Sequence, residues 1–493
     1  MLFNSYEFVF LFLPATLLIF FALGHYSRRV AAGWLAAASL FFYGWWNPLF
    51  LGLLLGSIVF NYTVGVALVR EHERRRETRQ YWTLFCGVAA NLALLGYFKY
   101  FNFFVASLNA TLDTKYAVGA IVLPLGISFF TFTQIAFLVD ASRGLVREFN
   151  FIHYVLFVTY FPHLIAGPVL HHKEMMPQFD KPQTYRLNYE CLAVGLTIFC
   201  IGLFKKVMLA DEMIKYVKPV FEAAAEGRAV SFKESWGAAF SYTLQLYFDF
   251  SGYSDMAIGL SRMFGVKLPL NFNSPYKSVN VIEFWRRWHM TLSRFLRDYL
   301  YIPLGGNRKG LARRHANLLL TMLLGGLWHG AGWTFVIWGG LHGVYLVINH
   351  AWHGLRLRWG HDLGKSTLPG RLAGGFVTFV AVVFAWVFFR ADSLQAGLAI
   401  TRAMLGLDGF VFTGHFQLNK IAELLFIVWV LPNTQQIMGQ FEPALPIREK
   451  EFGGVWKRLQ WQPNWIWLVF IFLIAVTSLS QGDKISEFLY FQF

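Results

Sequence analysis

A histidine within an uncharged stretch is the first residue whose type and position could do chemistry. Residues Leu323 to Gly343 read LLGGLWHGAGWTFVIWGGLHG, and the two histidines His329 and His342 are its only acidic or basic residues. Burying an imidazole without a partner costs free energy, so such a ring is either held by a hydrogen bond or reactive. A neutral imidazole can take the proton of an attacking hydroxyl as a general base. We expect this role for His329; the alternative is a core histidine bonded to a backbone carbonyl.

The glycines around His329 bear on this choice. Four of them lie within four residues of it, namely Gly325, Gly326, Gly330 and Gly332. Without side chains they would leave space beside the imidazole for an acyl chain or a cofactor. His342 lies thirteen residues further on, which on a continuous helix of about 3.6 residues per turn places it on a different face. The pattern favours chemistry at His329 and a lesser role for His342.

A second candidate, His289, interrupts an apolar stripe. The segment from Asn280 to Gly310 reads NVIEFWRRWHMTLSRFLRDYLYIPLGGNRKG, and its apolar residues recur at alternating steps of three and four. This spacing predicts one amphipathic helix. The residues on the stripe are Ile282, Trp285, His289, Leu292, Leu296 and Tyr299. Because the helix is basic, we expect it to lie at the cytoplasmic membrane interface or to dip in from it.

Two acidic residues stand in an apolar stretch. Asp249 and Asp255 lie in YFDFSGYSDMAIG, and a carboxylate at membrane depth is costly enough to indicate a functional site. A structural ion pair with one of the arginines is the equally open alternative. His171 and His172, after Pro168, are interpreted as polar residues of the membrane interface. The sequence has neither Cys-x-x-Cys spacing nor an H-E-x-x-H helix, so we expect no metal site.

The composition indicates the elements that must position these residues. Of 493 residues, 56% are hydrophobic and 14% charged, whereas roughly a quarter are charged in soluble proteins. We therefore predict an all-α, polytopic integral membrane protein, with residues 1–493 forming a single membrane-embedded domain. At ~20 residues per crossing, the apolar runs allow about ten to twelve transmembrane or re-entrant helices. Pro124, Pro162 and Pro168 indicate broken pieces among them.

The distribution of positive charge predicts the orientation of the chain in the membrane. The net charge is +15, and the densest run, REHERRRETRQ (Arg70 to Gln80), joins the third and fourth predicted spans. Arg28 and Arg29 follow the first span, and Arg143 and Arg147 follow the fifth. If the amino terminus starts outside, these loops share one side, which the positive-inside rule makes cytoplasmic. We expect no nucleic-acid partner.

Several long motifs extend over nearly the whole chain. They are NLALLGYFKYFNFF, LPLGISFFTF, FPHLIAGPVL, QLYFDFSGYSDMAIGL, EFWRRWHMTLSRFLRDYLYIPLGGNR, NLLLTMLLGGLWHGAGWTFVIWGGLHG, VFFRA and FLYFQF. Together they resemble the membrane-bound O-acyltransferase (MBOAT) family, most closely its bacterial polysaccharide branch, typified by the membrane subunit of alginate O-acetyltransferase. The resemblance implies that His329, in LWHG, is catalytic and that His289, in WRRWH, is a second catalytic candidate.

The resemblance also implies a function. We expect a multi-pass enzyme of the bacterial inner membrane that moves acetyl groups from cytoplasmic acetyl-CoA toward an exported polysaccharide of the alginate or cellulose type. Acetyl-CoA would be a co-substrate, with no bound cofactor, and a periplasmic or membrane-anchored acetyltransferase partner would complete the transfer. Membrane lipid would surround the protein. The expected substrate-binding residues are Trp285, Trp328, Asp249 and Asp255.

Two alternatives remain open at this point. The acceptor could be different, such as peptidoglycan, a lipid, or teichoic acid that receives D-alanine. The chain could instead be a proton-coupled transporter whose intramembrane histidines relay protons. A transporter is expected to show internal inverted repeats, and the sequence shows no such self-similarity.

Overall fold

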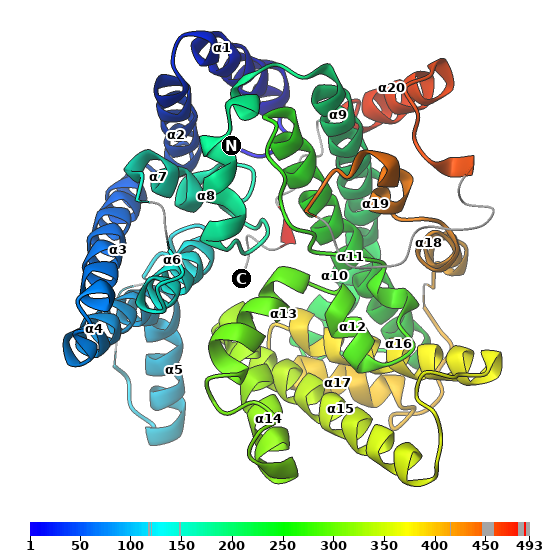
Figure 1. The fold of residues 1–493 in the computed structure, drawn as a ribbon. Helices are drawn as coiled ribbons and strands as arrows, with labels where there is room; N and C mark the ends of the chain where they lie inside the picture. Colours follow the sequence, from blue (N-terminus) through cyan, green and yellow to red (C-terminus); the bar gives the residue numbers. More distant parts are fainter. Residues whose placement is uncertain are drawn as a thin grey trace. The chain divides into compact units, whose positions relative to one another are not determined.

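Helices form all the regular secondary structure in the described part of the chain (Figure 1). The structure is a computed structural model that describes residues 1–116, 119, 121–146, 149–414, 416–445, 458–481 and 488–489. The predicted loop cation Arg147 lies outside these residues. The expectation of an all-α fold is confirmed.

The chain divides into two compact units. Unit 1 consists of Met1–Leu203, Tyr253–Leu270 and Met438–Gln492. Unit 2 consists of Phe204–Gly252 and Asn271–Ile437. One long helix, α11 (Phe232–Met263), contributes residues to both. The single domain predicted over residues 1–493 stays a prediction.

Unit 1 holds helices from the two ends of the chain. They are α1 (Leu13–Tyr26), α2 (Arg28–Gly44), α3 (Leu49–Glu73), α4 (Glu77–Leu95), α5 (Phe101–Leu112), α6 (Ile127–Ser142), α7 (Phe151–Thr159), α8 (His172–Asp180), α9 (Tyr189–Phe204) and α20 (Trp465–Leu479). A π-helical segment over Gly96–Tyr100 joins α4 to α5. α3 and α4 pack against α6, so α6 is almost completely buried.

An irregular segment, residues 160–171, lies buried between α7 and α8. It contains Pro162 and Pro168, as expected of residues that cannot continue a helix. Side chains from other helices bond its backbone: the Phe161 N–H donates to Ser39 Oγ at 3.2 Å, and the Ala166 N–H donates to the Tyr253 hydroxyl at 3.4 Å. Irregular backbone at membrane depth is tolerated only where the protein covers it in this way.

Unit 2 contains the candidate histidines His289 and His329 and the candidate tryptophans Trp285 and Trp328. Its helices are α10 (Ile214–Ala225), α12 (Val281–Arg287), α13 (Met290–Leu296), α14 (Gly310–His329), α15 (Trp333–Arg358), α16 (Leu368–Arg390), α17 (Leu394–Met404), α18 (Leu418–Val430) and α19 (Thr434–Ile437). α14 and α15 lie side by side (Figure 1), and α16 packs against α15.

Among the residues that the structure describes, five helical runs are long and apolar enough to cross a membrane. They are Glu7–Tyr26, Leu49–Glu73, Glu77–Leu112, Tyr189–Ala225 and Leu368–Arg390, with mean hydropathies from 1.4 to 2.3. Within the apolar windows of the second and third runs only 22% of residues are buried by protein, so their apolar surface faces outward, where lipid would cover it. The predicted total of ten to twelve crossings is not confirmed and stays a prediction.

Glycines allow α14 and α15 to approach closely. A Cβ added at Gly326 would collide with the Phe335 carbonyl oxygen and lie 3.1 Å from the Gly339 Cα, and a Cβ at Gly339 would collide with the Met322 carbonyl oxygen. Each backbone therefore occupies the space that a side chain at the glycine of the other helix would need. Gly354, also on α15, has no neighbouring atom within 4 Å of an added Cβ.

Substitution of the interhelical glycines should be destabilising. We expect Gly339→Ala to lower the free energy of unfolding by about 1–3 kcal/mol, the usual cost of overpacking a tight contact. Gly354→Ala is the matched control on the same helix and should be stabilising by roughly 0.5–1 kcal/mol, since alanine favours the helix. Thermal unfolding of the purified protein in detergent measures both. Equal melting temperatures for the two variants would contradict this packing.

Candidate active site

A break between two helices positions His289. α12 ends at Arg287, His289 adopts a left-handed backbone conformation (φ 41°, ψ 53°), and α13 begins at Met290. The prediction of one continuous helix from Asn280 is therefore wrong. A left-handed conformation is unfavourable for a residue with a side chain, so it persists only where surrounding contacts stabilise it.

Asn271 provides these contacts. Its side-chain oxygen accepts a 2.6 Å hydrogen bond from the Thr291 hydroxyl and lies 3.3 Å from His289 Nδ1, and its backbone carbonyl accepts from the Met290 N–H at 3.0 Å. An amide oxygen can only accept, so this arrangement places the imidazole proton on Nδ1 and leaves the basic lone pair on Nε2. Tertiary hydrogen bonds replace helical ones here, and helical periodicity carries no information about them.

His329 is the last residue of α14 and is buried among aromatic rings. Its ring centroid lies 4.9 Å from those of Trp328 and Trp338 and 5.3 Å from that of Phe389. The His289 ring is 6.2 Å away, centroid to centroid. The structure thus brings the two predicted catalytic histidines together in one buried aromatic cluster of unit 2. Trp328, a predicted substrate-binding residue, contacts both.

The glycines near His329 do not form an open wall. A Cβ at Gly325 would lie 3.2 Å from Leu296 Cδ1, and one at Gly330 would collide with the Phe335 ring. As at Gly326, the protein's own atoms occupy the space. The expectation that the glycines leave room for a ligand is therefore wrong at Gly325, Gly326 and Gly330, where they allow close packing, whereas a Cβ at Gly332 would lie 3.5 Å or more from its neighbours. Aromatic rings line the imidazole instead.

His342 lies on a different helix from His329. α14 ends at His329 and α15 begins at Trp333, so the argument from the faces of one continuous helix does not apply. Both imidazoles pack against Trp338, with ring centroids 4.9 and 5.0 Å away. The Trp285 indole N–H donates to His342 Nδ1 at 3.3 Å. Trp285, predicted to bind substrate, is thus a buried partner of His342.

Asp249 forms a buried ion pair. Its Oδ1 lies 2.7 Å from Lys206 Nζ, which also lies 2.8 Å from Asp211 Oδ1. The side chains of Lys206 and Asp249 are only 1% and 2% exposed. Asp249 thus has a structural ion pair, with a lysine and not with the expected arginine, and its role in substrate binding stays a prediction. Asp249 also precedes Phe250, whose ring centroid lies 4.9 Å from that of His289.

Asp255 and the adjacent histidines belong to unit 1. Asp255 is buried there, so the structure does not group it with the cluster in unit 2. His171 and His172 are buried too, with their Nδ1 atoms 4.0 and 3.3 Å from Asp140 Oδ2, and their position at the membrane interface stays a prediction. In the described ranges no three His, Cys, Asp or Glu side chains come close enough to hold a metal ion.

The model of the membrane-bound O-acyltransferase family matches residues 40–358. The chain belongs to this family. The match includes the candidate histidines His289 and His329, and it decides against the transporter alternative. The protein is therefore a membrane-bound acyltransferase, as its motifs predicted.

Several relatives of this acyltransferase are known. It is 45% identical over 438 residues to a peptidoglycan O-acetyltransferase of Helicobacter pylori, covering 83% of this chain and 80% of that one. It is 38% identical over 515 residues to a probable alginate O-acetylase of Pseudomonas putida, covering the whole of both chains. A teichoic acid D-alanyltransferase of Streptococcus thermophilus is 29% identical over 280 residues, 54% of this chain and 68% of that one.

The ion pair of Asp249 yields a prediction about stability. Asp249→Ala removes one of the two carboxylates that neutralise buried Lys206 and should lower the free energy of unfolding by roughly 3–5 kcal/mol. Asp408→Ala is the matched control, since Asp408 forms an exposed pair with Arg402 at 2.9 Å, and exposed pairs contribute about 0–1 kcal/mol. Thermal unfolding in detergent compares the two. If Asp249→Ala and Asp408→Ala lowered the melting temperature equally, the ion pair of Asp249 would not stabilise the fold.

Proposed function

We propose that this acyltransferase moves acetyl groups from cytoplasmic acetyl-CoA across the bacterial inner membrane for the O-acetylation of an exported polysaccharide. The observation that carries the proposal is the burial of His289 and His329 side by side in an aromatic cluster. The relatives support the acetyl group and the glycan acceptor, since two of them are named for O-acetyl transfer to alginate or peptidoglycan.

The chemistry requires a base. A hydroxyl is a weak nucleophile until its proton is removed, and a positioned base contributes roughly 10²–10⁴-fold to the rate. His329 would take this proton while the oxygen forms a bond to the acetyl carbonyl carbon. The carbon–sulfur bond of the thioester then breaks, and the imidazolium returns the proton to the departing thiolate. The thiol and the acetyl ester are the products.

His289 would assist from the helix break. The hydrogen bond between Nδ1 and Asn271 Oδ1 orients the ring, which lies beside the imidazole of His329, so His289 could help to position the reacting groups there. The surrounding rings of Trp328, Trp338 and Phe389 exclude water. Exclusion of water protects a reactive acyl group from hydrolysis. Trp328 would contact the substrate as well, because it touches both histidines.

The acceptor is proposed to be reached through a partner. A periplasmic or membrane-anchored acetyltransferase would receive the acetyl group and complete transfer to the sugar. Peptidoglycan is the second candidate acceptor, favoured by the 45% identity to the Helicobacter enzyme. Acetyl content of the secreted polymer and of purified peptidoglycan, measured in cells with and without the enzyme, separates the two.

Substitution of His329 tests the catalytic assignment. We expect His329→Ala to insert and fold, yet to lower acetylation about 10²-fold or more, because the base is lost. His342→Ala is the matched control: it removes a buried imidazole from the same tryptophan, Trp338. It should lower stability, as other large-to-small core substitutions do, but not acetylation per folded molecule. Acetyl content and membrane abundance are measured together. Near-normal acetylation by abundant His329→Ala protein would refute the assignment.

The variant His289→Ala distinguishes a role of His289 in acetyl transfer from a purely structural role. Acetyl transfer per folded molecule should fall more than the melting temperature does. If the two fall in proportion, His289 serves only to hold the helix break.

The orientation in the membrane is also proposed, with the amino terminus in the periplasm. Contacts within unit 1 connect the three basic loops. Arg28 donates to the last carbonyl of α8 at 3.2 Å, and His172, in the first turn of α8, lies 3.3 Å from the Leu145 carbonyl. Gln80, which ends the arginine-rich run, donates to the Ser142 carbonyl. The loops therefore share one side, and the positive-inside rule favours the cytoplasm for it.

Thiol labelling tests this orientation. In a background without the native cysteines, Arg76→Cys should react with a membrane-impermeant thiol reagent only after cell lysis. Lys115→Cys is the matched control, because it follows the opposite end of the apolar run Glu77–Leu112 and should react in intact cells. The reverse pattern would invert the proposed topology.

A further inference from the structure

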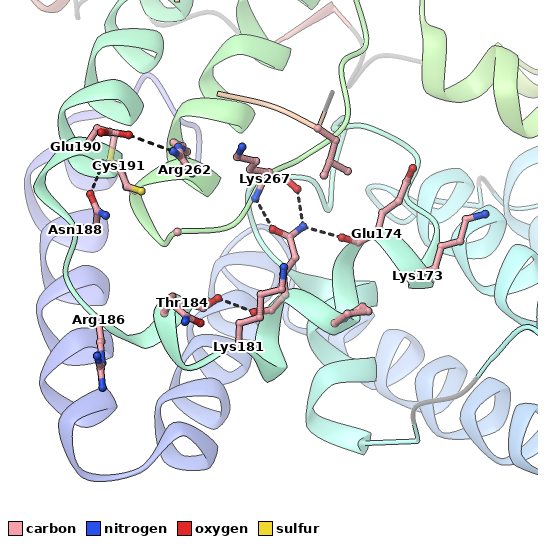
Figure 2. Close-up of a pocket in the computed structure, with 16 residues that line it drawn as sticks. Lys173, Glu174, Lys181, Thr184, Arg186, Asn188, Glu190, Cys191, Arg262 and Lys267 are labelled. Carbon is pink, nitrogen blue, oxygen red and sulfur yellow. Dashed lines mark hydrogen bonds and ion pairs between the residues drawn. The ribbon is translucent and has the colours of Figure 1, made fainter. Parts of the chain in front are cut away.

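A basic pocket in unit 1 lies apart from the histidine cluster. It encloses about 730 Å³, within the usual range for small-ligand sites. Five cations and two carboxylates line it, so positive charge is in excess. The charged lining residues are Lys173, Lys181, Arg186, Arg262, Lys267, Glu174 and Glu190 (Figure 2).

Arg262 is the residue that most requires a ligand. It is only 9% exposed, and its Nε has no hydrogen-bond partner within the described residues. Its printed ion pair is long, 3.8 Å from Nη2 to Glu190 Oε1, and the Glu190 side chain is 58% exposed. Figure 2 shows the two facing each other across the pocket wall. A buried guanidinium with so little compensation is costly, and an anion in the pocket would relieve that cost.

Hydrogen bonds connect the segments that form the wall of the pocket. The Gln178 side-chain amide donates to the Lys267 carbonyl at 2.8 Å and accepts from the Lys267 N–H at 2.8 Å, which ties α8 to the loop after α11. The same amide donates to the Glu174 carbonyl at 2.7 Å, and the Thr184 hydroxyl donates to the Gln178 carbonyl at 2.6 Å. These bonds hold the backbone of Lys267 in place, and its Nζ lies 3.2 Å from Oε2 of Glu442, whose side chain is 72% exposed.

The pocket adjoins the start of an apolar helical run that is long enough to cross a membrane. Its wall includes the start of α9, where the apolar run Tyr189–Ala225 begins. Tyr189 is 78% exposed, as expected for an aromatic residue at the membrane interface. α8, which contributes Lys173, also receives the hydrogen bond from Arg28, so the pocket shares the face of the basic loops.

We propose that this pocket binds a phosphate-bearing anion at the membrane surface, with the headgroup of an anionic phospholipid as the source that its place beside this apolar run favours. Arginine suits this role because its planar fork of donors can bond two phosphate oxygens at once. Lys267 and Lys181 add charge around the same space. This proposal does not depend on acetyl transfer, so a test of the pocket and a test of the proposed function can fail independently.

Ligand-dependent stability tests the site, because a ligand that binds only the folded state raises the melting temperature. Purified protein in a nonionic detergent is titrated with short-chain phosphatidylglycerol, short-chain phosphatidylcholine or inorganic pyrophosphate. We expect phosphatidylglycerol to raise the melting temperature by several degrees and phosphatidylcholine to have little effect. If only pyrophosphate raised the melting temperature, the pocket would still be a phosphate site, but its ligand would be a soluble phosphate and not a lipid.

Variants distinguish the pocket from general surface charge. Arg262→Gln should weaken binding about tenfold or more, the usual effect of losing a charge-assisted hydrogen bond. Arg79→Gln is the matched control, removing the same charge from an exposed position outside the pocket. If Arg262→Gln does not fold, the double variant Lys173→Gln and Lys181→Gln, at exposed positions, should still weaken binding. No response to either phosphate ligand, or an equal response from the pocket variants and Arg79→Gln, would overturn the proposal.

Discussion

Polar groups taken into an apolar interior need partners, and this constraint organises the chain. Lys206 is neutralised by Asp249 and Asp211, and the Trp285 indole N–H is matched to His342. Asp249 and His342 lie 43 and 57 residues from their partners in the sequence, and they meet them at hydrogen-bonding distance because a polar group in an apolar interior needs a protein partner where water is absent. The pairs fix the helices around the aromatic cluster, and the cluster fixes His329.

The helix break at His289 follows the same constraint. A left-handed residue between two short helices leaves backbone donors that a continuous helix would have satisfied. The segment that begins at Asn271 accepts from them and bonds the imidazole as well. Asn271 therefore both stabilises the helix break and orients the imidazole of His289.

The sequence allowed part of this to be predicted. Hydropathy and motif resemblance predicted the helical class and the family correctly, and they selected two histidines that the structure brings together, because those signals are local. The break at His289, the lysine partner of Asp249 and the protein atoms beside Gly326 depend on contacts between distant segments, which local patterns do not encode. A lysine inside an apolar run, Lys206, was the available sign that Asp249 has a cationic partner.

The buried irregular segment at residues 160–171 has a consequence for how the protein is made. Its Ala166 N–H is bonded by the Tyr253 hydroxyl, from a residue 87 positions later in the chain. Until that residue has been synthesised, this donor lacks its partner, and lipid cannot supply one. Unit 1 therefore cannot mature strictly in the order in which the ribosome delivers its helices. The native hydrogen bonding of the segment is complete only once α11 has been synthesised.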